Sequence, residues 1–260
     1  LYKLEDIGDG EKRAKPGDYV TAQITIRSEN DSILYDTYKM GLDGAVTFIL
    51  PPVAHQKDYR EGYLFLSEGD RATFITDAHA LFIKRNKSMV PKGMNLESFI
   101  RVETKVLKIR TPEEHTLEMQ EEKAKLDRGE FEEKKILNKY IADSCKDASL
   151  VANGMYCIQI ADGNDVTLDS GRVALLNYRG CFLNGRCFDS SFETQPFEYI
   201  LGTEDQLIAG LAVGVRRMRE GEKAKFIIPS HLAFGSSGSS TGMVPPFTTV
   251  IYEVELLKVQ

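Results

Sequence analysis

The chain lacks the features that mark several large classes of protein. Its 260 residues carry a formal charge of −6, and this acidic balance argues against a nucleic-acid surface, since proteins that follow phosphate backbones present a basic face. No apolar run reaches the roughly 18 residues that a membrane span requires. The chain begins at Leu1, without Met and without a charged and apolar leader, so we expect a processed or trimmed chain.

Histidine and cysteine are also scarce. The four histidines are scattered and no Cys-x-x-Cys pair occurs, so the sequence predicts no metal site. Cys157 is expected to be a small core residue, and Cys145 receives no assignment. Cys181 and Cys187 flank Asn184-Gly185, the signal of a two-residue hairpin with a type I′ turn. In that register the two thiols point to opposite faces of the hairpin, so no disulfide between them is predicted.

One stretch of the second half places a carboxylate beside an aromatic ring. Arg186 to Ser191 is typical of a strand that ends in a loop, and it contains Phe188 and Asp189 as neighbours. Because adjacent residues on a regular strand point to opposite faces, both can face one pocket only if the backbone bulges there. The hairpin places Tyr178 on the neighbouring strand. Nothing in this stretch resembles a nucleophile paired with a base.

Seven short patterns follow one another from this region to the end of the chain. They are Tyr-x-Gly, Phe-Asp-Ser-Ser, Pro-Phe-x-x-x-Leu-Gly, Gly-Val-x-x-Met-x-x-Gly, Ala-Phe-Gly, Val-Pro-Pro and Val-Glu-Leu-Leu. Their order over about ninety residues resembles the FKBP-type peptidyl-prolyl isomerases. The resemblance implies an antiparallel β-sheet wrapped on a short helix, no cofactor, and Xaa-Pro segments of unfolded or partly folded proteins as substrates.

The first half repeats the same order of events. Tyr35-Asp36 matches Phe188-Asp189, Gly62 matches Gly214, and Glu68-Gly69 matches Glu220-Gly221, at offsets of 150 to 154 residues. Further matches join Phe82 to Phe234, Val90-Pro91 to Val244-Pro245, and Lys108-Ile109 to Lys258-Val259. We interpret the two halves as an internal duplication. The alternative is two unrelated β-rich domains with similar turns.

A charged helix is predicted between the halves. Pro112-Glu113-Glu114 is a typical helix start, with acidic residues in the first turn. Leu117, Ala124 and Phe131 recur every seven residues, which would suit a homodimer seam, but three heptad positions are too few for a coiled coil. We therefore favour a solvated spacer whose last turns dock on the second domain.

The sequence thus predicts an α+β protein of two FKBP-like domains joined by a long charged helix. The expected domains are a degenerate FKBP-like domain over residues 1–110, a helical linker over residues 111–147 and an FKBP-type isomerase domain over residues 148–260. This acidic, helix-linked build resembles isomerases of the bacterial envelope, so we expect a periplasmic or lipid-anchored protein, on analogy alone.

The resemblance also implies a pocket in the second domain. Its catalytic residues would be Tyr178, Phe188, Asp189 and Phe234, and its substrate-binding residues Phe197, Leu207, Ile208, Leu211, Met243, Val244 and Tyr252. Leu211 would form the floor, Phe188 and Tyr252 the walls, and the backbone N–H of Ile208 would anchor the peptide. Asp189, embedded among aromatic residues and held by Tyr178, would act electrostatically on the rotating carbonyl.

Two departures from the family pattern predict reduced activity and poor binding of macrolide inhibitors. Strongly active members commonly carry Trp where Leu211 stands and Tyr where Phe234 stands.

The first domain departs further from the family pattern at the positions that correspond to the pocket. Thr25 corresponds to Tyr178, about Gln56 to Ile208, Val46 to Phe197 and Val102 to Tyr252, and Tyr59 falls near the floor. We expect it to be a non-catalytic copy that binds chains or acts as a spacer. The alternatives to an isomerase are a chaperone-like module that binds Pro-containing segments and a structural arm.

Overall fold

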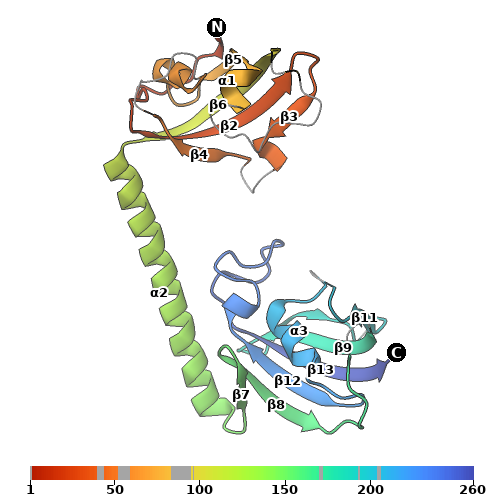
Figure 1. Cartoon of the computed structure of the whole chain (residues 1–260). Coiled ribbons are helices and arrows are strands. Elements are labelled where there is room, and N and C mark those ends of the chain that lie inside the picture. The colour runs from red at the N-terminus through yellow and green to blue at the C-terminus, as the bar shows by residue number, and fades with distance from the viewer. Residues whose placement is uncertain are drawn as a thin grey trace. The chain divides into compact units, whose positions relative to one another are not determined.

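The computed structural model describes residues 2–39, 44–51, 59–82, 95, 97–169, 172–192, 194–203 and 206–260, without the side chains of Ala80 and Phe82. The chain divides into two compact units, Leu1–Glu121 and Glu122–Gln260, and each contains an antiparallel sheet (Figure 1). The α+β class is confirmed. Among the residues matched between the two halves, Gln56, Val90-Pro91 and the side chain of Phe82 lie outside the described residues.

The first unit is a six-stranded sheet with short helical segments. Its strands are β1 (Tyr2–Asp6), β2 (Tyr19–Ser28), β3 (Ile33–Asp36), β4 (Val46–Ile49), β5 (Arg71–Asp77) and β6 (Phe99–Arg110). They pair in the order β1-β5-β6-β2-β3, and β4 pairs with β2. The helical segments are η1 (Thr37–Lys39), η2 (Tyr59–Phe65) and α1 (Ala78–Phe82). Side chains alternate along β2 between buried and half-buried, as expected for a sheet with one face on a core.

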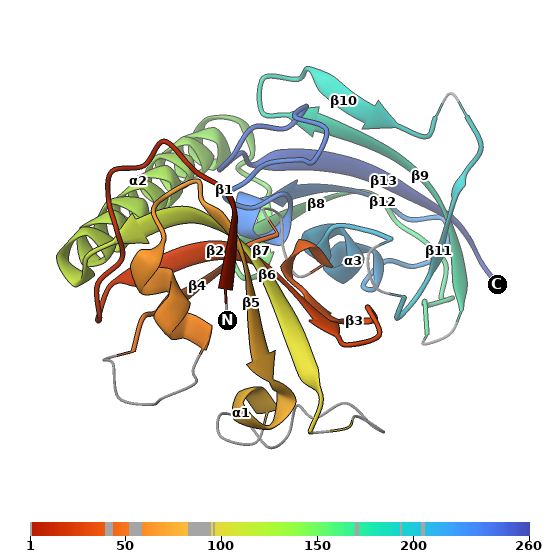
Figure 2. The ribbon, with the colours of Figure 1, turned by 90° about the horizontal axis from the view of Figure 1, so that it is seen from above.

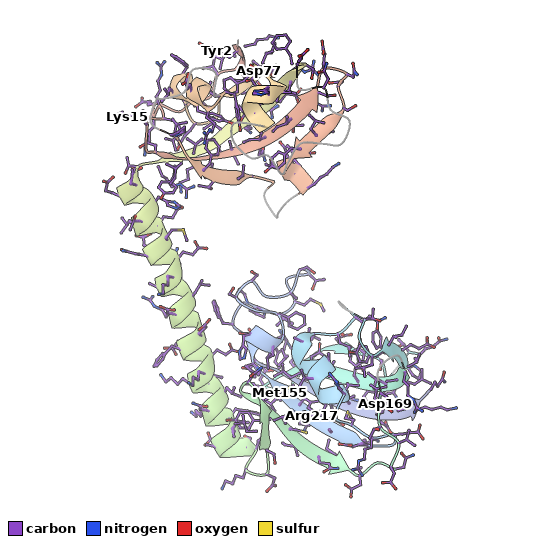
Figure 3. The ribbon with its side chains drawn as sticks, viewed as in Figure 1. Tyr2, Lys15, Asp77, Met155, Asp169 and Arg217 are labelled. Atoms are coloured by element: carbon purple, nitrogen blue, oxygen red, sulfur yellow. A yellow bond between two sulfur atoms is a disulfide. The ribbon has the colours of Figure 1, made fainter. Side chains whose placement is uncertain are left out.

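The second unit is a seven-stranded sheet with one short α-helix against it. Its elements are β7 (Ser149–Ala152), β8 (Met155–Ala161), β9 (Val173–Phe182), β10 (Cys187–Ser190), β11 (Phe197–Ile200), α3 (Ala209–Val215), β12 (Lys223–Ile228), η4 (Ser230–Leu232) and β13 (Val250–Val259). The strands pair in the order β10-β9-β13-β12-β8-β7, and β11 pairs with β9. Figure 2 shows α3 beside β12 and β13, which it contacts. Figure 3 labels Met155, fully buried at the start of β8, and Arg217, which donates to the carbonyl oxygen of Val151.

The two sheets have the same topology once β7 is set aside. Each strand of the first has a counterpart at the same place in the second: β1 with β8, β5 with β12, β6 with β13, β2 with β9, β3 with β10 and β4 with β11. Two unrelated β-rich domains would not share this order of pairing. The predicted duplication is therefore confirmed at the level of the fold.

Matched hydrogen bonds extend the correspondence to single atoms. Oε1 of Glu68 accepts a hydrogen bond from Ile109 N at 2.6 Å, and Oε2 of Glu220 accepts one from Val259 N at 2.8 Å. Each bond joins the turn before one strand to the end of the next. The residue after each glutamate is a glycine, with φ of 88° at Gly69 and 85° at Gly221. A left-handed backbone at both turns explains why glycine stands at both places.

Helix α2 (Pro112–Ser144) has 33 residues and stands between β6 and β7 in the sequence. It begins with a capping box, because Thr111 Oγ1 accepts from Glu114 N at 3.2 Å and Glu114 Oε2 accepts from Thr111 N at 2.8 Å. Near its other end, Leu137 is buried against Ile227 of the second unit. The predicted docking of the last turns is confirmed. No helix within the described ranges has the length and apolar character of a membrane span.

The hairpin between β9 and β10 corrects the predicted turn and the prediction for two cysteines. Phe182 N donates to Arg186 O, and Gly185 N donates to Phe182 O, so the loop contains three residues, with φ of 84° at Gly185. This is a turn closed by a glycine bulge rather than a two-residue type I′ turn. The extra loop residue shifts the pairing by one, and Cys187 lies opposite Cys181. The two form a disulfide, so the prediction of no bond was wrong.

Candidate functional site

The candidate site begins with a phenol and a carboxylate on neighbouring strands. Tyr178 on β9 donates a hydrogen bond from its hydroxyl to Oδ2 of Asp189 on β10, at 3.1 Å. The register between the strands shifts between Cys187 and Asp189, which leaves Phe188 at a bulge. The predicted bulge is therefore confirmed, and with it the pairing of Tyr178 with Asp189.

The surroundings of the carboxylate differ from the prediction. Asp189 is an exposed residue, so the expectation that it is embedded among aromatic residues was wrong. Burial and then the negative charge of Asp189 raise the pKa of Tyr178 above its usual value. The pKa of Tyr252 is raised as well, chiefly by burial and secondly by the charge of Asp189. Both phenols therefore remain hydrogen-bond donors at neutral pH, beside a solvent-facing negative charge.

Aromatic rings form the walls beside this pair. The ring of Phe188 makes edge contacts with Phe234 and Tyr252, at centroid separations of 6.2 and 6.0 Å. Tyr178 makes an edge contact with Phe197 at 6.0 Å. Edge-to-face geometry at these separations is the favoured arrangement of aromatic pairs. Three sequence-distant segments thus meet around Phe188.

Gly180 provides the space for two of these rings. A Cβ at this position would lie 3.0 Å from atoms of both the Phe188 and the Tyr252 rings. Gly180 pairs with Asp189 on one side and with Tyr252 on the other. A side chain here would push the walls outward, which explains the glycine in the Tyr-x-Gly pattern.

Ser191 fixes the loop after β10 and was not singled out from the sequence. Its hydroxyl oxygen accepts a hydrogen bond from Tyr178 N at 2.9 Å, and its own N–H donates to Tyr178 O at 2.9 Å. Ser191 is buried. The signal was present as the last residue of Phe-Asp-Ser-Ser, but nothing local shows which of two adjacent serines turns inward.

Helix α3 carries Leu211, the residue predicted to form the floor. Leu211 is 2% exposed, and Ile208 is the N-cap residue, so its N–H lies outside the intrahelical hydrogen bonds. All the predicted site residues except Asp189 and Met243 belong to one hydrophobic cluster, namely Tyr178, Phe188, Phe197, Leu207, Ile208, Leu211, Phe234, Val244 and Tyr252. Met243 is 52% exposed and lies outside that cluster.

The equivalent place in the first unit lacks the phenol. Ile24 N donates to Thr37 Oγ1 at 2.8 Å, as Tyr178 N does to Ser191 Oγ. The strand register agrees, because Ile24 pairs with Thr104 as Tyr178 pairs with Val254. The counterpart of Tyr178 is therefore Ile24, and the prediction of Thr25 was wrong.

The carboxylate of the first unit has a different partner. Oδ1 of Asp36 accepts a hydrogen bond from Tyr38 N at 3.0 Å. Asp36 also directly precedes the inward-turned Thr37, whereas Asp189 stands two residues before Ser191. The matched sequence pattern therefore does not place the two carboxylates alike.

A cavity of about 610 Å³ lies elsewhere in the second unit. Its lining comes from α2 and from nine residues after the helix, namely Asn153, Gly154, Tyr156, Pro229, Ser230, His231, Gly235, Ser236 and Phe247. None of the predicted site residues lines it. Cavity size therefore does not mark the candidate pocket, which is defined by the Tyr178–Asp189 pair and the rings beside it.

Comparisons with known proteins find similar sequences and structures. A family model described as FKBP-type peptidyl-prolyl cis-trans isomerase matches residues 165–257. The FK506-binding protein of Neisseria meningitidis is 38% identical over 107 residues, which is 41% of this chain and 96% of that protein. Among solved structures, FkpA from Escherichia coli is 23% identical and covers 58% of this chain and 73% of its own, with a TM-score of 0.44. The three FKBP domains of wheat FKBP73 are 18% identical and cover 100% of this chain and 94% of their own, with a TM-score of 0.40.

Proposed function

The chain belongs to the family of FKBP-type peptidyl-prolyl cis-trans isomerases, and on that premise we propose that its Glu122–Gln260 unit is the catalytic one. The observation that carries the proposal is the Tyr178–Asp189 hydrogen bond beside the Phe188 ring. The first unit has Ile24 at the place of Tyr178, and its Asp36 accepts from Tyr38 N instead. We propose that this first unit is a non-catalytic copy.

The reaction requires no covalent step. Rotation about an Xaa-Pro amide meets a barrier of about 18–20 kcal/mol because resonance keeps the amide planar. The twisted transition state has lost that resonance, so a pocket that removes water from the amide and grips the proline ring favours it over the planar ground state. In this proposal Leu211 supports the proline ring, and Phe188 and Tyr252 flank it. The negative charge of Asp189 acts on the rotating carbonyl.

The assignment to one unit has a direct test. We expect the full chain and residues 122–260 to accelerate cis-to-trans isomerisation of short Xaa-Leu-Pro and Xaa-Phe-Pro peptides equally. Residues 1–121 are expected to leave the uncatalysed rate unchanged, because Ile24 stands at the place of Tyr178 and Asp36 accepts from Tyr38 N instead of from a phenol there. A protease-coupled or NMR exchange assay measures these rates. Catalysis by residues 1–121, or none by residues 122–260 with an intact circular-dichroism spectrum, would contradict the proposal.

Reduced activity is part of the proposal, and Phe234 offers a way to test it. Phe234 cannot donate a hydrogen bond to a substrate carbonyl, and one net hydrogen bond contributes about 0.5–1.5 kcal/mol. We expect Phe234→Tyr to raise kcat/KM by a few-fold to about tenfold. The matched control is Phe182→Tyr, which alters another ring beside Phe188, at a centroid separation of 5.0 Å. A rise in the control but not at residue 234 would contradict this role.

The second candidate function is a chaperone-like module that binds Pro-containing segments without useful turnover. Leu211 in the floor and Phe234 at the wall favour it, because both weaken the grip on a twisted amide relative to the family pattern. Assistance to protein refolding that survives Asp189→Ala would support this reading.

We also propose that the protein is located in a bacterial periplasm or cell envelope. The Cys181–Cys187 disulfide supports it, because disulfides persist mainly in oxidising compartments.

A further inference from the structure

Helix α2 reaches the second unit through a buried carboxylate. Glu133 is 7% exposed, and its carboxylate accepts three hydrogen bonds. Ser230 N donates to Oε1 at 2.6 Å, Thr249 Oγ1 donates to Oε1 at 2.7 Å, and the Ser230 hydroxyl donates to Oε2. Ser230 and Thr249 are themselves 3% and 4% exposed. A buried carboxylate with this many donors holds them in one geometry, because each unpaired group would be costly.

The first partner controls the segment that carries Phe234. Ser230 opens η4, and its carbonyl oxygen accepts hydrogen bonds from Ala233 N and Gly235 N, both at 2.8 Å. These two residues stand on either side of Phe234. The position of Ser230 therefore sets where the Phe234 ring meets Phe188.

The second partner controls the start of β13. Thr249 directly precedes this strand, which carries Tyr252. The rings of Phe234 and Tyr252 are the two that make edge contacts with Phe188 in the candidate pocket. One carboxylate of α2 thus bridges the two segments that supply these rings.

A second contact of the helix reaches the same segment. Gly129 stands four residues before Glu133, and residues at this spacing share a helix face. A Cβ on Gly129 would lie 2.5 Å from the Phe247 ring, so the ring packs directly on the helix backbone. Phe247 N in turn donates to Gly235 O at 3.1 Å.

We propose that Glu133 is a positioning residue of the isomerase site. It holds Ser230 and Thr249, and through them it sets the spacing of Phe234 and Tyr252 around Phe188. Helix α2 is on this account a part of the catalytic unit. The inference rests on the proposed function, since it assigns to Glu133 a role in the pocket of the second unit.

The test uses the full chain and compares Glu133→Ala with two matched controls. We expect Glu133→Ala to lower kcat/KM by about three- to tenfold, because three donors lose their acceptor and the two rings move. Glu133→Gln is expected to recover most of the activity, since its amide oxygen still accepts from Ser230 N and Thr249. Glu132→Ala changes an exposed neighbour and should leave the rate unchanged. Leu137→Ala weakens the same docking contact without touching Ser230, so it should lower stability but preserve kcat/KM at a temperature where the protein stays folded.

A second readout separates this proposal from the assignment of the reaction. The NMR shifts of the Phe234 and Tyr252 ring protons report their placement over Phe188, whether or not turnover occurs. We expect them to change in Glu133→Ala, to return towards wild type in Glu133→Gln and to stay constant in Leu137→Ala. Unchanged ring shifts in Glu133→Ala, or an equal loss of activity in Leu137→Ala, would overturn the positioning role. An inactive wild-type chain would overturn the proposed function, while the ring shifts would still decide the role of Glu133.

Discussion

Replacing Asp189 by alanine in the full chain is expected to lower kcat/KM for Xaa-Pro peptides by about tenfold to thirtyfold. Fixed charges and dipoles in closed active sites are worth about 10²–10³ in rate. Asp189 is exposed, so solvent weakens its field and the expected loss is smaller. Asp189→Asn keeps an acceptor for the Tyr178 hydroxyl but removes the charge, and it should lie between alanine and wild type.

The first unit provides a matched control for this experiment. Asp36→Ala removes the carboxylate that matches Asp189 in sequence, but that carboxylate accepts from Tyr38 N rather than from a phenol. We expect no change in kcat/KM. Tyr178→Phe combined with Asp189→Ala should cost less than the two single changes together, because the hydroxyl and the carboxylate are partners. An Asp189→Ala chain as active as wild type would refute the electrostatic role.

Removing the last turns of α2 is expected to cost the second unit about 4–6 kcal/mol of its free energy of unfolding. Residues 148–260 contain all of its sheet but lack Leu137 and Cys145, which are buried, and Tyr140 and Ile141, which pack beside them. Burial of apolar surface contributes about 25 cal/mol per Å², or about 1.5–3 kcal/mol for a fully buried large side chain. The loss of Glu133 adds to the cost, because Ser230 and Thr249 would exchange a carboxylate for water.

Urea unfolding of residues 122–260 and 148–260, followed by circular dichroism, measures the difference. The control is a cut that removes only the part of the helix that belongs to the first unit. Residues 112–260 and 122–260 should unfold at the same urea concentration, because the second compact unit begins at Glu122. Equal midpoints for residues 122–260 and 148–260 would show that the helix contact contributes nothing to stability.

Much of the fold could be predicted from the sequence because turns carry local signals. The Glu-Gly pairs at residues 68–69 and 220–221 mark turns in which the glycine takes a left-handed backbone and the glutamate bonds the end of the last strand. Their spacing from Gly62 and Gly214 is the same in both halves. Added Cβ atoms at these last two glycines would strike the rings of Phe74 and Phe226. The duplication could therefore be recognised from glycines that stand at matched positions because a side chain there would clash.

The register of strand pairing was harder to predict than the order of the strands along the chain. An Asn-Gly pair suits a two-residue turn, but it also suits a three-residue loop in which glycine closes the bulge, and the two differ by one position. A shift of one residue changes every partner across the hairpin. The disulfide between Cys181 and Cys187 was missed for this reason. The assignment of Thr25 in place of Ile24 failed in the same way.

The tertiary partners of Glu133 could not be predicted from the sequence. Glu133 is one glutamate among many on a charged helix, and its partners Ser230 and Thr249 lie 97 and 116 residues away. A glutamate on a charged helix is expected to be exposed to solvent. Only the folded arrangement shows that it is buried, because no local pattern distinguishes it from its exposed neighbour Glu132.

Because the two sheets share one topology, each can serve as the control for substitutions made in the other. Hydrogen bonds present in both copies, such as those of Glu68 and Glu220, stabilise the shared fold. Where the copies differ, as at Tyr178 and its counterpart Ile24, the proposed function assigns the difference to catalysis. The requirements of folding and those of chemistry can therefore be separated within a single chain, by moving side chains from one copy onto the matched backbone of the other.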